Sequence, residues 1–230
     1  MDKHDQISLS GKKKTIFSVT YRFVLTIVIL PAILDRAGIF SGNLQLHTLY
    51  SFTTISNGYI MLVTLITVFI TFSSAESIGL KISRLRTIGV MMILMTGLIY
   101  HFILLPQKIA ENLNYQVFTY GNIVAHYIAP IGMFMDWLLF DRKGRINKWE
   151  PLIYTSVPVV YFIIASIYGY YGSTIPNKET SYVYFFMDWG KLGIAGVMKW
   201  VLLILICILC LAYLIYFIDY SLAKRKGTSA

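Results

Sequence analysis

The sequence predicts an all-α, multi-pass membrane protein with six transmembrane helices. Of the 230 residues, 57% are hydrophobic and only 13% are charged, whereas a typical soluble domain carries about 25% charged residues. Six apolar runs are each long enough to cross a hydrocarbon core of about 30 Å as a helix. The runs lack the alternation of barrel strands, and a helix satisfies all of its backbone polar groups within lipid. We therefore expect one six-helix domain over residues 15–220, between tails at 1–14 and 221–230.

The apolar runs follow one another with short polar loops between them, at approximately 15–34, 48–73, 86–105, 119–140, 152–172 and 192–218. The first run follows a basic tail, as a signal peptide does. However, it is about twenty residues long and contains Arg22, whereas the apolar part of a cleavable signal is about 7–15 residues. We interpret it as a retained transmembrane helix.

The remaining runs each carry a feature of their own. The second contains the polar sextet FTTISN at 52–57, about five residues from its start. The third ends near His101. The fourth contains HYIAP, in which Pro130 has no N–H to donate to the carbonyl of His126, so we expect a kink there. In the fifth, tyrosines recur every seven residues and should form one stripe that packs toward the bundle; they are Tyr154, Tyr161 and Tyr168.

The distribution of Lys and Arg predicts the orientation. The two tails and the loops around residues 81–86 and 142–148 hold fourteen of the twenty basic residues, whereas the opposite loops hold four: Arg36, Lys108, Lys178 and Lys191. We therefore place both termini in the cytoplasm and the protein in the cell membrane. The net charge of +9 is explained by this topology and by contact with anionic lipid headgroups, so we expect no nucleic-acid partner.

Polar residues on four of the predicted helices fall at a similar depth below the outer surface. At about 1.5 Å per residue, Thr53 and Thr54 lie roughly 8–9 Å below it, and His126 and Lys199 about 10 Å. His101 lies about 6 Å below it by the same rise. Buried ionisable groups in a membrane indicate function because they are costly. The alternatives are structural: a Thr can bond its own i−4 carbonyl, and a His can join two helices.

Two further polar residues belong to this group. Asn57 follows Thr53 by four residues and Thr54 by three, so it can share a helix face with either. Asn122 precedes His126 on the fourth run. Nearer the cytoplasmic side, Asp136 lies at a depth similar to that of Arg22, and we expect a structural ion pair between them.

Four segments resemble a family of bacterial six-helix membrane proteins: SFTTISN at 51–57, GNIVAHYIAPIGMFMDWLLF at 121–140, PLIY at 151–154 and YVYFFMDWGKLG at 182–193. That family is similar to the eukaryotic androgen-induced and androgen-dependent TFPI-regulating proteins. The resemblance implies intramembrane hydrolysis of fatty-acid esters of hydroxy fatty acids, with a Thr nucleophile and a His base. The His corresponds to His126. The bacterial pattern selects Thr53 as the nucleophile, and the eukaryotic spacing before Asn57 selects Thr54.

We therefore predict a threonine-type carboxylic ester hydrolase with catalytic residues Thr53, Thr54 and His126, and favour Thr53 as the nucleophile, with Thr54 bonding a backbone carbonyl. The predicted substrate-binding residues are Asn57, His101, Lys199 and Asn122, and Asn57 or Lys199 could stabilise the oxyanion. Membrane lipids and a fatty-acid ester or another small amphiphile are the expected partners. We expect no metal and no cofactor. The oligomeric state stays open. The alternative is a non-catalytic lipid-binding protein or a proton-coupled transporter, although the sequence shows none of the internal repeats typical of transporters.

Overall fold

The computed structural model describes residues 3–71, 76–172, 174–175 and 180–225 of this chain, and no strand occurs among them. In chain order, the elements are α1 (Lys3–Arg36), the 3₁₀ turn η1 (Leu46–Tyr50), α2 (Phe52–Thr71), α3 (Glu76–Ile99), the π turn η2 (Tyr100–Leu104), α4 (Leu105–Glu111), α5 (Tyr120–Ile123), the π turn η3 (Val124–Ile128), α6 (Ala129–Phe140), α7 (Glu150–Tyr171), the 3₁₀ turn η4 (Phe185–Met187) and α8 (Trp189–Arg225).

Six segments are long and apolar enough to cross a membrane, which confirms the predicted all-α, multi-pass class. They are Lys13–Arg36, Phe52–Thr71, Lys81–Glu111, Tyr120–Phe140, Glu150–Tyr171 and Trp189–Arg225. The third and fourth spans are continuous across a π turn, so that α3, η2 and α4 form one span and α5, η3 and α6 form another.

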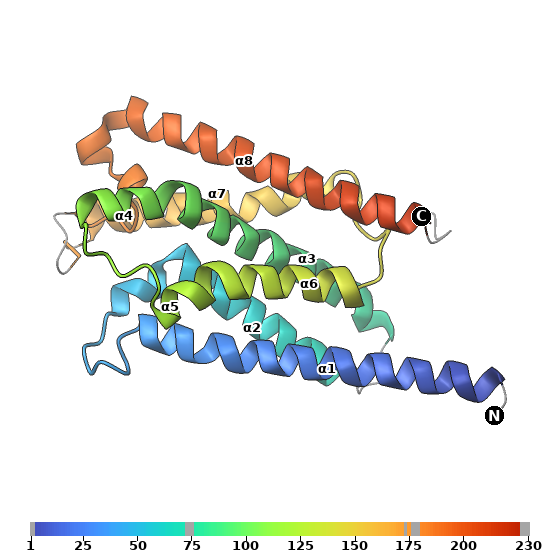
Figure 1. Cartoon of the computed structure of the whole chain (residues 1–230). Helices are drawn as coiled ribbons and strands as arrows, with labels where there is room; N and C mark the ends of the chain where they lie inside the picture. The colour runs from blue at the N-terminus through green and yellow to red at the C-terminus, as the bar shows by residue number, and fades with distance from the viewer. Residues whose placement is uncertain (1–2, 72–75, 173, 176–179, 226–230) are drawn as a thin grey trace.

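Both ends of the chain lie at one end of the bundle, at the right of Figure 1. We call this the proximal end and the opposite one the distal end. The helices α1, α2, α3 and α6 pack in a ring, because α1 contacts α2 and α6 while α3 contacts the same two helices. The pair α7 and α8 packs against α3 outside this ring. The main apolar core lies between the helices of this ring and extends to α7 and α8.

The helix α2 begins four residues later than the predicted second run. Residues 46–50 form the η1 turn instead, and Ser51 starts the helix by accepting a hydrogen bond from the backbone N–H of Thr54 at 3.2 Å. A serine at this position satisfies one of the N–H groups that a helix start leaves free. The sextet FTTISN therefore occupies the first two turns of α2 at the distal end, rather than a position five residues inside the helix.

The third and fourth spans each contain a π turn, followed within two residues by a proline. The turn η2 precedes Pro106, and η3 precedes Pro130. Because proline has no N–H, the carbonyl four residues before it cannot make the usual helical bond. The chain accommodates this by widening one turn, and such π turns are frequent at functional sites. The predicted kink at His126 thus takes the form of a wider turn.

The tyrosine stripe of α7 packs inward over only part of its length. Tyr154 is buried and donates to the Glu150 carboxylate of its own helix at 2.8 Å, while the Tyr161 hydroxyl accepts from the backbone N–H of Phe52 at 3.1 Å. Tyr168, nearer the distal end, is 45% exposed. The predicted inward packing is confirmed for Tyr154 and Tyr161 and is wrong for Tyr168.

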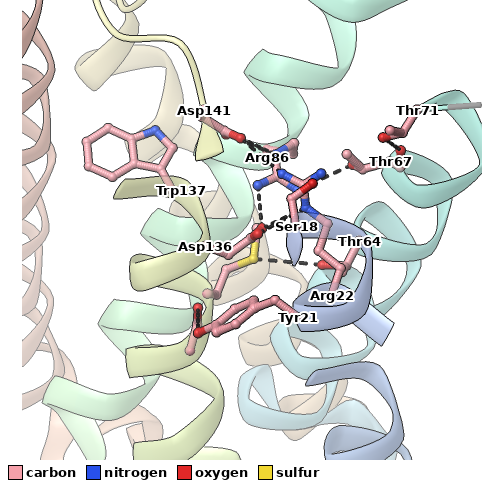
Figure 2. A network of polar contacts seen from close by, with 12 residues as sticks. Ser18, Tyr21, Arg22, Thr64, Thr67, Thr71, Arg86, Asp136, Trp137 and Asp141 are labelled. Atoms are coloured by element: carbon pink, nitrogen blue, oxygen red, sulfur yellow. Dashed lines mark hydrogen bonds and ion pairs between the residues drawn. The ribbon is translucent and has the colours of Figure 1, made fainter. Parts of the chain in front are cut away.

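A cluster of four charged side chains lies in the proximal half of the bundle (Figure 2). Arg22 of α1 is paired with Asp136 of α6 at 3.0 Å and with Asp141 at 3.5 Å, and Arg86 of α3 is paired with Asp141 at 2.9 Å and with Asp136. We call these four residues the ionic cluster. The predicted pair of Arg22 and Asp136 is confirmed. The assignment of Arg86 to a loop is wrong, because α3 begins at Glu76 and buries Arg86 within the bundle.

Candidate functional site

The first turn of α2 and the π turn η3 bring Thr53 and His126 together at the distal end. The hydroxyl Oγ1 of Thr53 lies 3.5 Å from Nε2 of His126, and both residues are buried, with exposed fractions of 4% and 3%. Proton transfer needs a separation of about 2.6–3.2 Å, and such bonds are often longer before substrate binds. A shift of less than about 1 Å would therefore make this pair competent.

A backbone carbonyl fixes the tautomer of His126. The Nδ1 atom lies 3.0 Å from the carbonyl oxygen of Asn122. A carbonyl can only accept a hydrogen bond, so Nδ1 carries the proton of the neutral ring and Nε2 is left with a free lone pair. That lone pair is directed at Thr53. The orienting role that a carboxylate plays in many catalytic triads is thus taken here by a main-chain group, which the sequence does not reveal.

One tyrosine stacks on the imidazole, and a second tyrosine links the first to Asn122. The ring of Tyr100 stacks on His126 with a centroid separation of 3.6 Å and an interplanar angle of 10°. The Tyr100 hydroxyl lies 3.3 Å from the Tyr115 hydroxyl, which accepts from the side-chain amide of Asn122 at 2.9 Å. The predicted residue Asn122 therefore supports the site, through both its carbonyl and its amide. Tyr100 was not predicted from the sequence, although it is adjacent to His101, because a tyrosine at this depth has no distinguishing spacing.

Asn57 joins the two helices that carry Thr53 and His126. Its amide nitrogen donates to the carbonyl of Thr53 at 2.8 Å and to that of Ala125 at 3.2 Å. Both N–H groups of the amide are used in this way, and Asn57 lines neither of the two cavities described below. The structure thus places Asn57 beside the Thr–His pair as a positioning group rather than as a donor to an oxyanion.

Thr54 is directed away from His126. Adjacent residues on a helix point about 100° apart, so Thr54 does not face His126 as Thr53 does. The Thr54 hydroxyl lies 3.1 Å from the Ser51 hydroxyl. Thr54 is buried, but its partner is another hydroxyl rather than the backbone carbonyl that we expected. Of the two candidate nucleophiles, only Thr53 faces the imidazole.

The remaining two predicted residues lie outside this cluster. His101 is exposed on η2, and its Nδ1 lies 3.1 Å from the hydroxyl of Tyr127. Lys199 is exposed on α8 and lines neither cavity. Similar depth was the only reason to group them with Thr53 and His126, and depth does not determine the direction in which a helix presents a side chain.

Two cavities meet at Thr53. The polar cavity, of about 920 Å³, opens at the distal end and is lined by His126, Asn122 and several charged groups. The apolar cavity, of about 170 Å³, lies between α2, α3, α7 and α8 among Leu, Ile, Met, Val and Phe side chains. Thr53, Leu104 and Tyr184 line both. An amphiphile could therefore place its two halves on either side of the Thr53 hydroxyl.

Tyr184 supplies a hydroxyl at this junction. It precedes η4 in the loop that closes the distal end, and its phenol interacts with the Thr53 hydroxyl. Burial raises the pKa of the Tyr184 phenol above its ordinary value. The group therefore stays protonated at neutral pH and remains a hydrogen-bond donor.

No family model, curated protein or solved structure matches this chain. Within the described parts of the sequence, no three His, Cys, Asp or Glu side chains come together as a metal site would require. The chemistry of the site therefore has to be argued from the hydroxyl, imidazole and phenol groups that surround the two cavities.

Proposed function

We propose that this integral membrane protein is a lipid hydrolase that cleaves fatty-acid esters, with Thr53 as nucleophile and His126 as base. The observation that carries the proposal is the position of the Thr53 hydroxyl: it faces the unprotonated Nε2 of a tautomer-fixed His126 at the junction of a polar and an apolar cavity. A hydroxyl is a weak nucleophile unless a base takes its proton, and this arrangement provides the base where an ester carbonyl would lie. The sequence resemblance to intramembrane threonine hydrolases is in accord with it.

The reaction would follow the two steps of acyl transfer. Nε2 of His126 takes the proton of Thr53 as Oγ1 bonds to the ester carbonyl carbon. The bond to the alcohol oxygen then breaks, and the imidazolium returns its proton to that oxygen. A water molecule attacks the acyl-threonine in the second step, with His126 again accepting the proton. The fatty acid leaves, and the Thr53 hydroxyl is restored.

Both halves of the substrate have a compartment of suitable chemistry. The acyl chain would lie in the apolar cavity, where its burial is favourable, and the polar part would lie in the polar cavity, from which water enters. Tyr184 would donate to the oxyanion because it lines both cavities and remains protonated. It replaces Asn57 and Lys199, the donors expected from the sequence.

We infer that the distal end faces outward and that both termini are cytoplasmic in the cell membrane, because basic residues are concentrated at the proximal end. Reporter fusions test this. A fusion after Ala230 or an insertion near Gly144 should report a cytoplasmic location, and an insertion near Asn177 an external one. An external signal from the Ala230 fusion would reverse the orientation and place the site in the inner leaflet.

A covalent fluorophosphonate probe and turnover of a long-chain p-nitrophenyl ester test the hydrolase directly. Thr53→Ala and His126→Ala should each lower turnover by about 10³-fold or more and abolish labelling, whereas Thr53→Ser should keep measurable activity. Thr54→Val is the matched control: it removes the adjacent buried hydroxyl while keeping the shape, and turnover should stay within about twofold of wild type. Full activity in Thr53→Ala would reject the proposal.

The second candidate is a lipid-binding protein or carrier without chemistry. The observation that favours it is the pair of adjoining cavities, which would accommodate an amphiphile whether or not it is cleaved. If neither Thr53→Ala nor His126→Ala changes probe labelling, while both weaken binding of a fatty-acid analogue, this alternative replaces hydrolysis.

A further inference from the structure

Arg36, at the end of α1, is a half-buried cation for which the described residues supply no ion pair. Arg22 and Arg86, the other two arginines within the bundle, each contact two carboxylates. By contrast, Nε of Arg36 is buried and has no hydrogen-bond partner in the described part of the chain. The Arg36 backbone carbonyl accepts from the Thr48 hydroxyl at 2.9 Å.

The side chain of Arg36 lines the polar cavity. It lies within electrostatic range of the His126 ring and of the hydroxyls of Tyr100, Tyr115 and Tyr184. Tyr100 stacks on His126 and Tyr184 interacts with Thr53, so Arg36 is near the Thr–His pair. Two further cations, Lys108 and Lys191, line the same cavity.

The acidic groups of the polar cavity do not neutralise Arg36. Asp35 is exposed and lies against Gly121. Asp188 accepts from the backbone N–H of Lys191 at 2.9 Å, and Glu111 accepts from the amide of Gln107. None of the three carboxylates lies within ion-pair distance of the Arg36 guanidinium in the described structure, although all three line the cavity.

A guanidinium that has lost part of its hydration without gaining a counter-charge is unfavourable. The cost is recovered if an anion enters, because the planar guanidinium binds two oxygens of a carboxylate or phosphate at once. A guanidinium that lines an open cavity without an ion pair is therefore the arrangement expected of a binding residue. The paired arginines of the ionic cluster show how the same chain treats an arginine with a structural role.

We propose that Arg36 binds the anionic group of an amphiphile, a carboxylate or a phosphate, in the polar cavity, while the hydrocarbon chain occupies the apolar cavity past Thr53. This inference concerns binding and holds whether or not the bound molecule is cleaved. If hydrolysis also occurs, anchoring at Arg36 sets which bond of the amphiphile lies beside Thr53, so Arg36 would determine specificity.

Three probes with the same chain test the proposal: dodecanoate, dodecyl phosphate and dodecanol. Each is added at an equal mole fraction to the full-length protein in a neutral maltoside detergent, and the thermal unfolding midpoint is measured. At saturating concentration an anionic probe should raise the midpoint by about 5 °C or more, and its apparent affinity should exceed that of dodecanol at least tenfold. A response to dodecanoate alone identifies a carboxylate ligand and a response to dodecyl phosphate alone a phosphate ligand; either result supports the proposal. Equal responses to dodecanol and both anions would overturn it.

Substitutions then assign the effect to Arg36. In Arg36→Gln the preference for anions over dodecanol should disappear, and Arg142→Gln, an exposed arginine at the proximal end, is the matched control that should leave it unchanged. If Arg36→Gln does not fold, Arg36→Lys serves instead. It keeps the charge but loses the two-pronged geometry, so anion affinity should fall about tenfold while dodecanol affinity is constant. Retention of wild-type anion affinity in these Arg36 variants would reject the assignment.

The test separates this inference from the proposed hydrolase. None of the three probes is a carboxylic ester, and all can be measured in Thr53→Ala. If Thr53→Ala retains the Arg36-dependent anion preference while ester turnover proves absent from the wild type, the binding site stands and the hydrolase proposal fails. If turnover is present and depends on Thr53 while the anion preference is absent, the reverse holds.

Discussion

The proximal and distal ends of the bundle bury polar side chains in opposite ways. In the proximal ionic cluster, two arginines meet two carboxylates across three helices, so each charge has more than one partner. At the distal end, the Thr53–His126 bond is long at 3.5 Å, and Arg36 has a buried nitrogen without a partner in the described structure. The distal groups also adjoin a large cavity.

The difference separates buried polar groups that hold the helices together from polar groups that are left available to a ligand. A buried network whose members are all paired fixes how helices pack, because every alternative packing would leave a charge unpaired. A group that stays incomplete beside a cavity is costly in the absence of a ligand, and the cost is recovered on binding. The same chain contains both cases, so the comparison can be tested by substitutions of matched chemistry at the two ends.

The largest effect should come from Arg86 in the ionic cluster. Arg86→Gln leaves Asp136, which is fully buried, with one cationic partner in place of two, and should lower the free energy of unfolding by about 3–5 kcal/mol. Chemical denaturation in mixed micelles would measure the loss. The double variant Arg86→Met with Asp136→Leu leaves Arg22 and Asp141 to pair with each other. The double variant should be more stable than either single variant. If its free energy of unfolding is lower than that of both, the stability of the cluster depends on residues other than its four members.

A smaller effect is expected at Asn57, which ties the Thr53 helix to the His126 helix. Asn57→Ala removes two buried hydrogen bonds and should cost about 1–3 kcal/mol. Because it loosens the Thr–His geometry, ester turnover should fall at least tenfold. The control is Ser56→Ala, which loses the bond to Thr96 of the neighbouring α3 at 2.8 Å and the bond to the Thr53 carbonyl within α2 at 3.1 Å. It should show a stability loss of about 1 kcal/mol without the loss of turnover.

A substitution at Gly97 tests how closely α3 approaches the π turn η3. A Cβ atom there would lie 2.9 Å from the carbonyl oxygen of His126 and 3.2 Å from Cγ of Pro130. Gly97→Ala should therefore push the helices apart and cost about 1–2 kcal/mol. At Gly58, also within a helix, a Cβ would meet nothing within 4 Å, and Gly58→Ala should stabilise by about 0.5–1 kcal/mol. Chemical denaturation of the two variants measures both changes in the free energy of unfolding. Equal changes in the same direction would contradict the expected difference between the two glycines.

The smallest effect is expected at Arg36 in the absence of added amphiphile. No ion pair with a described residue is lost in Arg36→Gln, so the free energy of unfolding should change by no more than about 0.5 kcal/mol, or rise. This is the reverse of the result for Arg86→Gln, although the chemical change is identical. A loss of several kcal/mol in delipidated protein would show that Arg36 has a structural role like that of Arg86, and the contrast between the two ends would disappear.

The sequence was sufficient to predict the helices but not their contacts. Length and hydropathy predict each span because the membrane fixes how long an apolar helix must be. Depth along a helix also identified the pair of Arg22 and Asp136. The helix that starts at Glu76 rather than near residue 86 was not predictable, since its first residues are polar, and this is why Arg86 was placed in a loop.

The two central residues of the candidate site were predicted from the sequence, but the groups around them were not. A Thr and a His at similar depth indicated a pair, but the direction of each side chain around its helix decides which residues meet. That direction selects Thr53 over Thr54 and leaves Lys199 exposed. The carbonyl of Asn122 and the hydroxyl of Tyr184 act through positions created by a π turn and a folded loop, and neither has a pattern in the sequence.

The π turn η3 also sets the direction in which the residues after it face. It thereby aligns Asp136, in the proximal ionic cluster, with His126 at the distal end. Its wider turn takes up one residue more than an α-helical turn over about the same rotation. If the same residues wound as a regular α-helix, everything after the turn would be rotated by about 100° and shifted by about 1.5 Å along the axis. With His126 held in place, Asp136 would then point away from Arg22 and Arg86. A substitution that straightened η3 would thus break the ionic cluster, whereas deleting the extra residue of the turn would leave Asp136 in phase.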